Sequence, residues 1–346
     1  MRNKKEIKIG NLIIGGNNQV VIQSMTNTKT KDILATVNQI KNLEKIGCMI
    51  VRVAVLDEND AVAIKEIKNQ INIPIVADIH FDYKLAILAI KSGADKIRIN
   101  PGNIGSSDKV KMVVDVAKEY NIPIRIGINS GSIEKHLLEK YGGPTPEAML
   151  ESITNHVKLL ESFDFYNIVL SIKSTSIENT IKTNRLLQEN FNYPIHIGLT
   201  ESGTVSSGSI RSSYALGVLL SEGIGDTIRV SLNGDPVKEI PVCKEILSMH
   251  NLYKKPTLIC CPTCGRTAYN MVPIVDAIEK YLETIDKEIT VAIMGCVVNG
   301  PGEAKHATIG IAGGKGEAVL FKHGEIIRKI KEENIIEELI NEINSL

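Results

Sequence analysis

Three of the six cysteines lie in two short motifs near the C-terminus. Cys261 and Cys264 form a Cys-Pro-Thr-Cys pair, and Cys296 precedes the stretch Val-Val-Asn-Gly-Pro-Gly that leads to Glu303. Three thiolates leave one position of a four-ligand metal site open. Zinc could take His306 there, whereas an iron–sulfur cluster accepts three cysteines and one different ligand, such as Glu303. The prolines and glycines around the cysteines favour the cluster, and a carboxylate ligand is easily displaced by a substrate oxygen.

A second set of residues could bind a polyanion. Five cations lie in otherwise apolar segments: Arg52, Arg98, Arg125, Lys173 and Arg229. Such side chains are almost never buried unpaired, and a local carboxylate is the usual partner of one strand arginine. Only Asp78, Glu201 and Asp226 are available for all five. A phosphate-containing ligand would satisfy them, because guanidinium donates two parallel hydrogen bonds to phosphate and ammonium adds a compact charge.

Other polar residues lie at or just after the ends of apolar runs in the sequence. They are Asp78, His80, Asn100, Asn129, Thr200, Glu201 and Ser231. Asp78 and His80, like Arg98 and Asn100, are two residues apart and therefore project from one face of a strand. A strand-end histidine such as His80 is more often a structural hydrogen-bonding group than a catalyst.

The elements that position these residues repeat one unit from Gln19 to about His250. A β-branched apolar run, a polar turn and a segment of helical period follow one another, which is typical of βα units. We count eight runs: Val20–Ser24, Met49–Val55, Pro74–Ile79, Lys96–Asn100, Ile122–Ile128, Asn167–Ile172, Pro194–Leu199 and Thr227–Leu232. Eight strands could form an open doubly wound sheet or a (β/α)8 barrel. The polar residues come late in each run, which favours the barrel, whose active site lies at the carboxyl ends of its strands.

The composition changes between Leu252 and Pro256. Beyond this point we predict helices over Tyr269–Glu283 and Ile326–Ile343, and three strands: Ile289–Met294, Ala307–Ala312 and Ala318–Phe321. This pattern indicates a separate α+β module of ordinary domain size. We therefore expect a barrel domain over residues 1–252 and a smaller domain over 256–346.

The overall composition excludes several classes of protein. Lysine and arginine total 40 in 346 residues, as do aspartate and glutamate, so no global field favours nucleic acid or an acidic membrane. No signal peptide or membrane-spanning apolar run is present, and we expect a cytoplasmic protein. Cysteines in such a chain serve metal or redox chemistry more often than disulfides. Cys48, Cys243 and Cys260 are interpreted as buried or incidental thiols.

These motifs together resemble a known family. Besides the cysteine motifs, they are Val21-Ile-Gln-Ser-Met-Thr-Asn-Thr, Ala77-Asp-Ile-His-Phe, Ile97-Arg-Ile-Asn-Pro-Gly-Asn, Ile124-Arg-Ile-Gly-Ile-Asn-Ser-Gly and Gly198-Leu-Thr-Glu-Ser-Gly. The chain closely resembles the 4-hydroxy-3-methylbut-2-en-1-yl diphosphate synthases of the methylerythritol phosphate pathway, in their two-domain bacterial form. The resemblance covers essentially the whole chain. It implies a TIM-type barrel followed by an iron–sulfur domain similar to those of sulfite and nitrite reductases.

The resemblance also implies an activity and a site. The enzymes open the ring of 2-C-methyl-D-erythritol 2,4-cyclodiphosphate reductively and remove water, using a [4Fe–4S] cluster and ferredoxin or flavodoxin as electron donor. By position, the implied cluster ligands are Cys261, Cys264, Cys296 and Glu303. The implied diphosphate ligands are Arg52, Arg98, Arg125 and Lys173. The implied lining residues are Asp78, His80, Asn100, Asn129, Thr200, Glu201, Arg229 and Ser231, with Glu201 as proton donor for the departing hydroxyl.

The assembly and two alternatives complete the expectations. We expect a homodimer in which the cluster domain of one chain caps the barrel of the other, because the linker Asn251–Lys255 reaches only about 18 Å when extended. A pterin-handling barrel such as dihydropteroate synthase shares the strand-end polar residues but needs no cluster. A zinc-stabilised binding module fused to a barrel would have no enzymatic activity.

Overall fold

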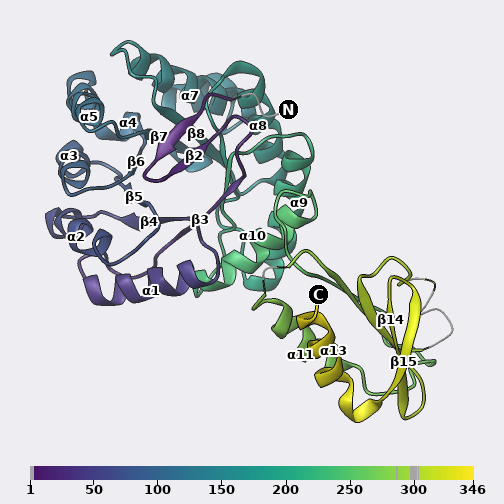
Figure 1. Cartoon of the computed structure of the whole chain (residues 1–346). Coiled ribbons are helices and arrows are strands. Elements are labelled where there is room, and N and C mark those ends of the chain that lie inside the picture. The colour runs from purple at the N-terminus through teal and green to yellow at the C-terminus, as the bar shows by residue number, and fades with distance from the viewer. Residues whose placement is uncertain (1–3, 286, 297–301, 303) are drawn as a thin grey trace. The chain divides into compact units, whose positions relative to one another are not determined.

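The computed structural model describes residues 4–285, 287–296, 302 and 304–346. The chain divides into two compact units, Met1–Leu252 and Tyr253–Leu346, which we call the barrel unit and the C-terminal unit (Figure 1). Each unit has a β-sheet of its own.

The barrel unit is built on eight parallel strands among the described residues. They are β3 (Val21–Met25), β4 (Ile50–Ala54), β5 (Ile75–Asp78), β6 (Lys96–Ile99), β7 (Ile124–Asn129), β8 (Ile168–Lys173), β9 (His196–Ile197) and β10 (Thr227–Ile228). Their order in the sheet is β8-β7-β6-β5-β4-β3-β10-β9. A parallel bridge between Leu170 and Ile195 brings β8 beside β9 and closes the ring. The predicted (β/α)8 barrel is confirmed, and the open doubly wound sheet is wrong.

Helices surround these strands, as Figure 1 shows. Several begin at an aspartate whose side chain accepts a hydrogen bond from a backbone N–H of the first turn. Asp32 caps α1 through Ala35 N at 3.1 Å, and Asp82 caps α3 through Lys84 N at 2.8 Å. The helices are α1 (Ile33–Lys45), α2 (Glu58–Lys68), α3 (Tyr83–Lys91), α4 (Pro101–Ile104), α5 (Ser107–Glu119), α6 (Lys135–Tyr141), α7 (Pro146–Glu161), α8 (Ile177–Asn190), α9 (Val205–Ser221) and α10 (Glu239–Ser248), with 3₁₀ turns at Ser130–Ser132 and Pro236–Lys238.

An N-terminal hairpin covers the amino-terminal end of the barrel. Strands β1 (Ile7–Ile9) and β2 (Leu12–Ile14) pair antiparallel, and Figure 1 shows them lying across the strands. Their buried isoleucines pack against Val21, Ile50, Val76 and Val169 at the amino-terminal half of the barrel. The hairpin was not predicted from the sequence. It leaves the carboxyl end of the strands as the open end.

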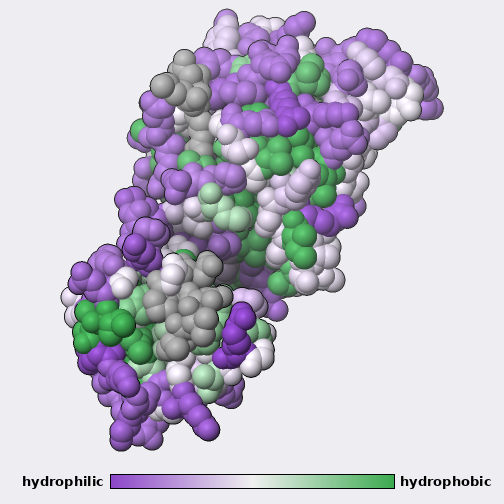
Figure 2. Space-filling view, turned by 90° about the vertical axis from the view of Figure 1, so that its right-hand side faces the viewer, coloured by the Kyte–Doolittle hydropathy of each residue, from purple (hydrophilic) through white to green (hydrophobic). Residues whose placement is uncertain are grey.

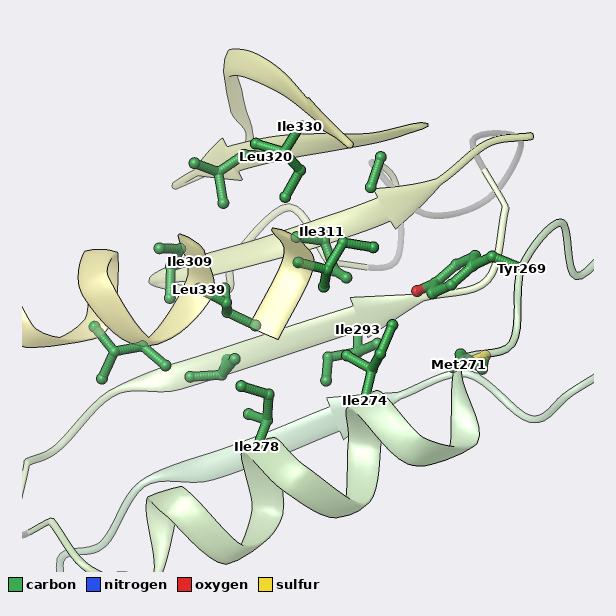
Figure 3. Close-up of a cluster of buried hydrophobic side chains, with 14 of the residues drawn as sticks. Tyr269, Met271, Ile274, Ile278, Ile293, Ile309, Ile311, Leu320, Ile330 and Leu339 are labelled. Atoms are coloured by element: carbon green, nitrogen blue, oxygen red, sulfur yellow. The ribbon is translucent and has the colours of Figure 1, made fainter. Parts of the chain in front are cut away.

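In its described residues, the C-terminal unit contains a mixed sheet with helices packed against it. Strands β11 (Thr257–Cys260), β12 (Thr290–Met294) and β13 (Ile309–Gly313) are parallel, and β14 (Glu317–Lys322) and β15 (Glu325–Lys331) continue the sheet antiparallel. Figure 3 shows Ile274 and Ile278 of α11 (Val272–Leu282) and Leu339 of α13 (Ile335–Asn344) pointing to the apolar side chains of the sheet. This shared core includes Ile293 and Ile311.

One predicted helix of this unit is wrong in its first half. The segment Ile326–Ile343 was expected to be helical throughout, but residues Glu325–Lys331 form β15, and the helix begins only at Ile335. His323 and Gly324 have φ angles of 47° and 81°, and this left-handed pair is the geometry that joins two antiparallel strands tightly. Pairing with β14 therefore overrides the helical spacing of Ile326 and Ile330.

The surface carries apolar residues in separate patches. On the face shown in Figure 2, the hydrophobic residues lie in separate patches among hydrophilic residues and residues of intermediate hydropathy. Within the described ranges, no helix combines the length and the apolar character needed to cross a membrane.

Candidate functional site

The predicted cations lie in the barrel interior, from the early part of β7, where Arg125 is the second residue, to the carboxyl end of β8, where Lys173 is the last. Asp78, Arg98 and Arg125 occupy matching positions on the neighbouring strands β5, β6 and β7, and Asn129 of β7 stands beside Lys173 of β8. The interior of such a barrel is usually filled by branched apolar residues. Neighbouring strands thus bring these predicted residues close together inside the barrel.

Asp78 is the centre of this group. Its carboxylate lies 3.2 Å from Arg98 Nη1 and 3.5 Å from Arg52 Nε. The His80 Nε2 atom is 3.9 Å away on a half-exposed side chain. Burial alone would raise the pKa of Asp78, but the charges of Arg52, Arg98 and Arg125 outweigh it and hold this pKa at about 2. Asp78 is therefore a carboxylate at neutral pH, and it neutralises only part of the surrounding charge.

A second carboxylate, Glu239, was missed in the sequence. It is the first residue of α10 and is 1% exposed. Arg229 donates to it in a two-pronged contact, from Nε to Oε2 at 3.2 Å and from Nη2 to Oε1 at 3.0 Å. Ser24 Oγ also donates to Oε2 at 2.8 Å. Ten residues separate Glu239 from Arg229, and no short-range pattern links a helix start to the preceding strand in this way.

Two buried cations have nitrogen atoms without an acceptor among the described residues. Arg125 Nε and Nη1 and Lys96 Nζ have no hydrogen-bonding partner among the described residues, although both side chains are almost completely buried. Burial lowers the pKa of Lys96 and of Lys173 well below the usual lysine range, with Arg125 the next cause for Lys96 and Arg52 for Lys173. Unpaired buried cations are unfavourable, so this interior is suited to receive an anion. Lys96 was also missed, although it stands two residues before Arg98 on the same face of β6.

His196 is also completely buried in the barrel unit. Its Nδ1 shares a hydrogen bond of 2.7 Å with Thr227 Oγ1, and its Nε2 has no partner in the described part of the chain. Burial, followed by the charge of Lys173, lowers the pKa of His196 well below the usual histidine value. The ring is therefore neutral at physiological pH.

Two glycines let these long side chains approach the strands. A Cβ atom on Gly127 would lie 2.4 Å from Arg98 Nε, and one on Gly198 would lie 2.8 Å from Lys173 Nζ. Gly127 lies within β7 and Gly198 directly follows β9, and a glycine in such a place often marks close approach of another group. Replacement of Gly127 would displace Arg98, and a Cβ atom on Gly198 would also lie 2.7 Å from the backbone oxygen of Arg229.

The remaining predicted residues line the rim. Asn100 Oδ1 accepts a hydrogen bond from Gly102 N at 3.1 Å and caps α4. Asn129 ends β7 and caps the 3₁₀ turn that follows. Glu201 is exposed and has a φ of 54°, a strained value for this residue type that is common at functional sites. Thr200 and Ser231 follow β9 and β10 and are partly buried.

The cysteines lie at the carboxyl edge of the C-terminal sheet. Cys261 directly follows β11, Cys264 stands three residues on, and Cys296 comes two residues after the parallel strand β12. Gly295 N donates to Cys261 Sγ at 3.0 Å, the kind of hydrogen bond that stabilises a thiolate ligand. Thiolate donors at adjacent strand ends fit an iron–sulfur cluster in type. Glu303 lies outside the described residues.

In the part of the chain that the structure describes, the cysteines of the two motifs are not grouped around a single metal position. Within residues 4–285, 287–296, 302 and 304–346, no three His, Cys, Asp or Glu side chains are grouped closely enough to hold a metal ion. Cys48 and Cys243 are buried as predicted, and burial raises the pKa of each thiol to about 12. Cys260 is exposed beside Cys261.

Comparison with known proteins identifies the family. The GcpE TIM-barrel domain matches residues 4–244, and the GcpE protein C-terminal domain matches residues 257–345. The chain belongs to the GcpE family. The resemblance found in the sequence motifs is thereby confirmed, together with the expectation of an enzyme.

Close relatives of this GcpE protein carry one name. Proteins called 4-hydroxy-3-methylbut-2-en-1-yl diphosphate synthase (flavodoxin) are 60% identical in Caldicellulosiruptor saccharolyticus, over 99% of both chains, and 57% identical in Ruminiclostridium cellulolyticum, over 99% of this chain and 97% of the relative. The namesake from Clostridium perfringens is 57% identical over 99% of this chain and its own full length.

Solved structures resemble this GcpE protein in fold alone. Dihydropteroate synthase from Xanthomonas albilineans has a TM-score of 0.51 at 12% identity, and covers 70% of this chain with 98% of its own. 3-Dehydroquinate dehydratase from Geobacillus kaustophilus has the same TM-score at 11% identity. The match covers 73% of this chain and 99% of the dehydratase chain. The barrel is shared with these enzymes, whereas the family match sets aside a pterin-handling function and a binding module without activity.

Proposed function

We propose that this chain catalyses the reaction for which its relatives are named, the formation of 4-hydroxy-3-methylbut-2-en-1-yl diphosphate in isoprenoid precursor biosynthesis. The substrate is 2-C-methyl-D-erythritol 2,4-cyclodiphosphate. The C2–O bond to phosphate breaks, the C3 hydroxyl leaves as water, and two electrons and two protons are consumed. The observation that carries the proposal is an excess of buried cations in the barrel interior. Arg52 and Arg98 share the carboxylate of Asp78, and Arg125 has nitrogen atoms without a hydrogen-bonding partner among the described residues.

The cations bind and stabilise the diphosphate. Breaking the C2–O bond places negative charge on a phosphate oxygen, which Arg125, Lys173 and the arginines around Asp78 stabilise from fixed positions. They need little reorganisation because protein packing already holds them. Asn100, Asn129, Thr200 and Ser231 line the rim with hydrogen-bonding groups, and His80 stands beside Asp78.

The cysteines hold the cofactor in this proposal. Cys261, Cys264 and Cys296 ligate a [4Fe–4S] cluster, with Glu303 as the fourth ligand. When bound, the cluster supplies electrons one at a time. The backbone N–H of Gly295 donates to the Cys261 sulfur, and this hydrogen bond would stabilise the sulfur as a thiolate ligand. Glu201 delivers the proton with which the C3 hydroxyl leaves.

The partners are an electron donor and a second copy of the chain. Flavodoxin, which the relatives' name includes, or ferredoxin supplies the electrons in the cytoplasm. The C-terminal unit of one chain caps the barrel of the other. This arrangement is supported by exposed apolar side chains that follow three consecutive barrel strands. Leu34 lies in the first turn of α1, and Leu56 and Phe81 lie in the connections that precede α2 and α3; they are 72%, 74% and 69% exposed.

Anaerobic purification followed by a turnover assay tests the proposal. We expect a brown protein with broad absorption near about 400 nm, iron and sulfide in equal amounts, and conversion of the cyclic diphosphate with reduced flavodoxin. A colourless protein containing zinc, or a loaded enzyme that leaves the cyclic diphosphate unchanged, would overturn it.

A further inference from the structure

Glu239 contacts three separate parts of the barrel unit. It receives Arg229 after β10, the Ser24 hydroxyl of β3, and the backbone N–H of Leu232 at 3.3 Å. Strands β3 and β10 are the first and last of the eight strands and are neighbours in the sheet. The Glu239 carboxylate therefore links the neighbouring strands β3 and β10 to helix α10, in which Glu239 is the first residue.

The guanidinium of Arg229 lies in a repulsive environment. Met25 Sδ is 3.1 Å from Arg52 Nε and 3.7 Å from Arg229 Nη1, so the two arginines approach one thioether from different strands. Two like charges at this separation repel each other in a buried site. Arg229 keeps its position because its Nε and Nη2 atoms both donate to the carboxylate of Glu239.

The third nitrogen of the Arg229 guanidinium, Nη1, points to a different neighbour. With Nε and Nη2 on Glu239, Arg229 presents Nη1 toward Met25 and the arginine beside it. An anion among the cations would therefore meet Arg229 through a defined edge of its guanidinium. Glu239 itself is almost completely buried and needs no contact with the ligand.

We propose that Glu239 is a positioning residue, which fixes the orientation of Arg229 for the diphosphate and does not touch substrate itself. The inference rests on the proposed function. A purely electrostatic role makes the opposite prediction, because removal of one negative charge from a cationic site strengthens the binding of an anion.

Two substitutions separate these roles. Glu239→Gln keeps the size of the side chain and removes its charge. Glu239→Asp keeps the charge and shortens the side chain, so that it no longer reaches both nitrogens of Arg229. Calorimetry on the cofactor-loaded, full-length protein measures the dissociation constant for 2-C-methyl-D-erythritol 2,4-cyclodiphosphate. We expect both variants to bind about tenfold more weakly, which corresponds to about 1.4 kcal/mol.

The barrel surface offers a matched control. Arg185 makes the same two-pronged contact with Glu222, but this pair is exposed on the outside of the barrel unit. Glu222→Gln should leave the dissociation constant unchanged. Action through Arg229 is tested in an Arg229→Ala background, in which Glu239→Gln should cause no further loss of affinity.

Each outcome decides one question. If the wild-type protein does not bind the cyclic diphosphate, the proposed function is wrong. If it binds, tighter binding by Glu239→Gln with unchanged binding by Glu239→Asp overturns the positioning role, as do two variants that bind like wild type. Should neither variant fold, Ser24→Ala removes one hydrogen bond to Glu239 and should weaken binding about threefold. Unchanged affinity in that variant also overturns the inference.

Discussion

Arg98 Nη1 lies 3.2 Å from Asp78 Oδ1, between neighbouring strands, and both side chains are buried. Arg98 Nη2 also donates to the carbonyl of Gly127 at 3.1 Å. The guanidinium is thus held from two sides before any ligand arrives. Asp78 is the carboxylate that makes the neighbouring cations compatible with a folded barrel.

The first prediction concerns acid stability. The pKa of Asp78 is about 2 in the folded protein and 3.8 in an ordinary aspartate, so the folded state favours the ionised form. This stabilisation of about 2 kcal/mol is fully present above about pH 4 and is lost as the pH falls toward 2. Urea unfolding at a series of pH values should show this loss in the wild-type protein. In Asp78→Asn this fall in the free energy of unfolding between about pH 4 and pH 2 should be missing. If the free energy of unfolding of that variant depends on pH as in the wild-type protein, the assignment to Asp78 is wrong.

The second prediction is a trade between stability and binding at Arg125. Two nitrogens of this buried side chain have no acceptor among the described residues, so its charge destabilises the ligand-free barrel. Arg125→Met fills similar space without charge and should raise the free energy of unfolding by about 1–3 kcal/mol. The same variant should lose affinity for the cyclic diphosphate by about 2–5 kcal/mol.

The matched control for Arg125 is Arg98, which has acceptors in Asp78 and Gly127. Arg98→Met should lower both stability and affinity, because it leaves the Asp78 carboxylate without one of its partners. Denaturant unfolding and calorimetry measure the two quantities separately. Equal destabilisation in both variants would show that Arg125 has a protein partner in solution.

The third prediction compares neighbouring cysteines. Cys261→Ser, Cys264→Ser and Cys296→Ser should each lose the iron–sulfur absorption and all turnover, because each removes one of three thiolate ligands. Cys260→Ser changes an exposed thiol next to Cys261 and should keep iron content and activity. Iron analysis after anaerobic purification distinguishes them. Loss of iron in Cys260→Ser would place that thiol in the ligand set.

Features that depend on neighbouring residues could be predicted from the sequence, whereas features that depend on contacts between distant segments could not. The barrel strands could be predicted because a short β-branched apolar run is a local signal, and the alternation of side chains along a strand placed Arg98 and Asn100 on one face. The strand β15 could not, because its pairing depends on a two-residue turn at His323 and Gly324 that competes with a helical pattern. Glu239 could not, because its role arises only when α10 returns beside β3.

The fourth prediction concerns Glu201. Glu201→Gln keeps the size and hydrogen-bonding capacity of the side chain but cannot deliver a proton. We expect substrate affinity within about twofold of wild type and turnover lowered by about 10²–10⁴. Calorimetry and a steady-state assay give the two values. Normal turnover would assign proton delivery to another group, and lost affinity would assign Glu201 to binding.

The last prediction tests whether the active site is shared between two chains. Helix α10 follows β10 and returns the chain toward the amino-terminal end of the barrel, opposite the cations. The linker Asn251–Lys255 reaches at most about 18 Å, and we predict that it is too short to bring the C-terminal unit of the same chain to the open end. A second copy, related by a two-fold axis, removes this constraint on reach.

Complementation between two inactive chains gives the measurement. Arg98→Ala inactivates the barrel and Cys296→Ser inactivates the cluster, and the two proteins are mixed after reversible dissociation. Half of the randomly formed dimers contain one chain of each kind, and in a shared arrangement each of these has one intact site. Activity should recover to about a quarter of the wild-type value. If each site is built within one chain, the mixture stays inactive, and mass spectrometry of the mixed dimers establishes that such a result reflects the arrangement of the sites.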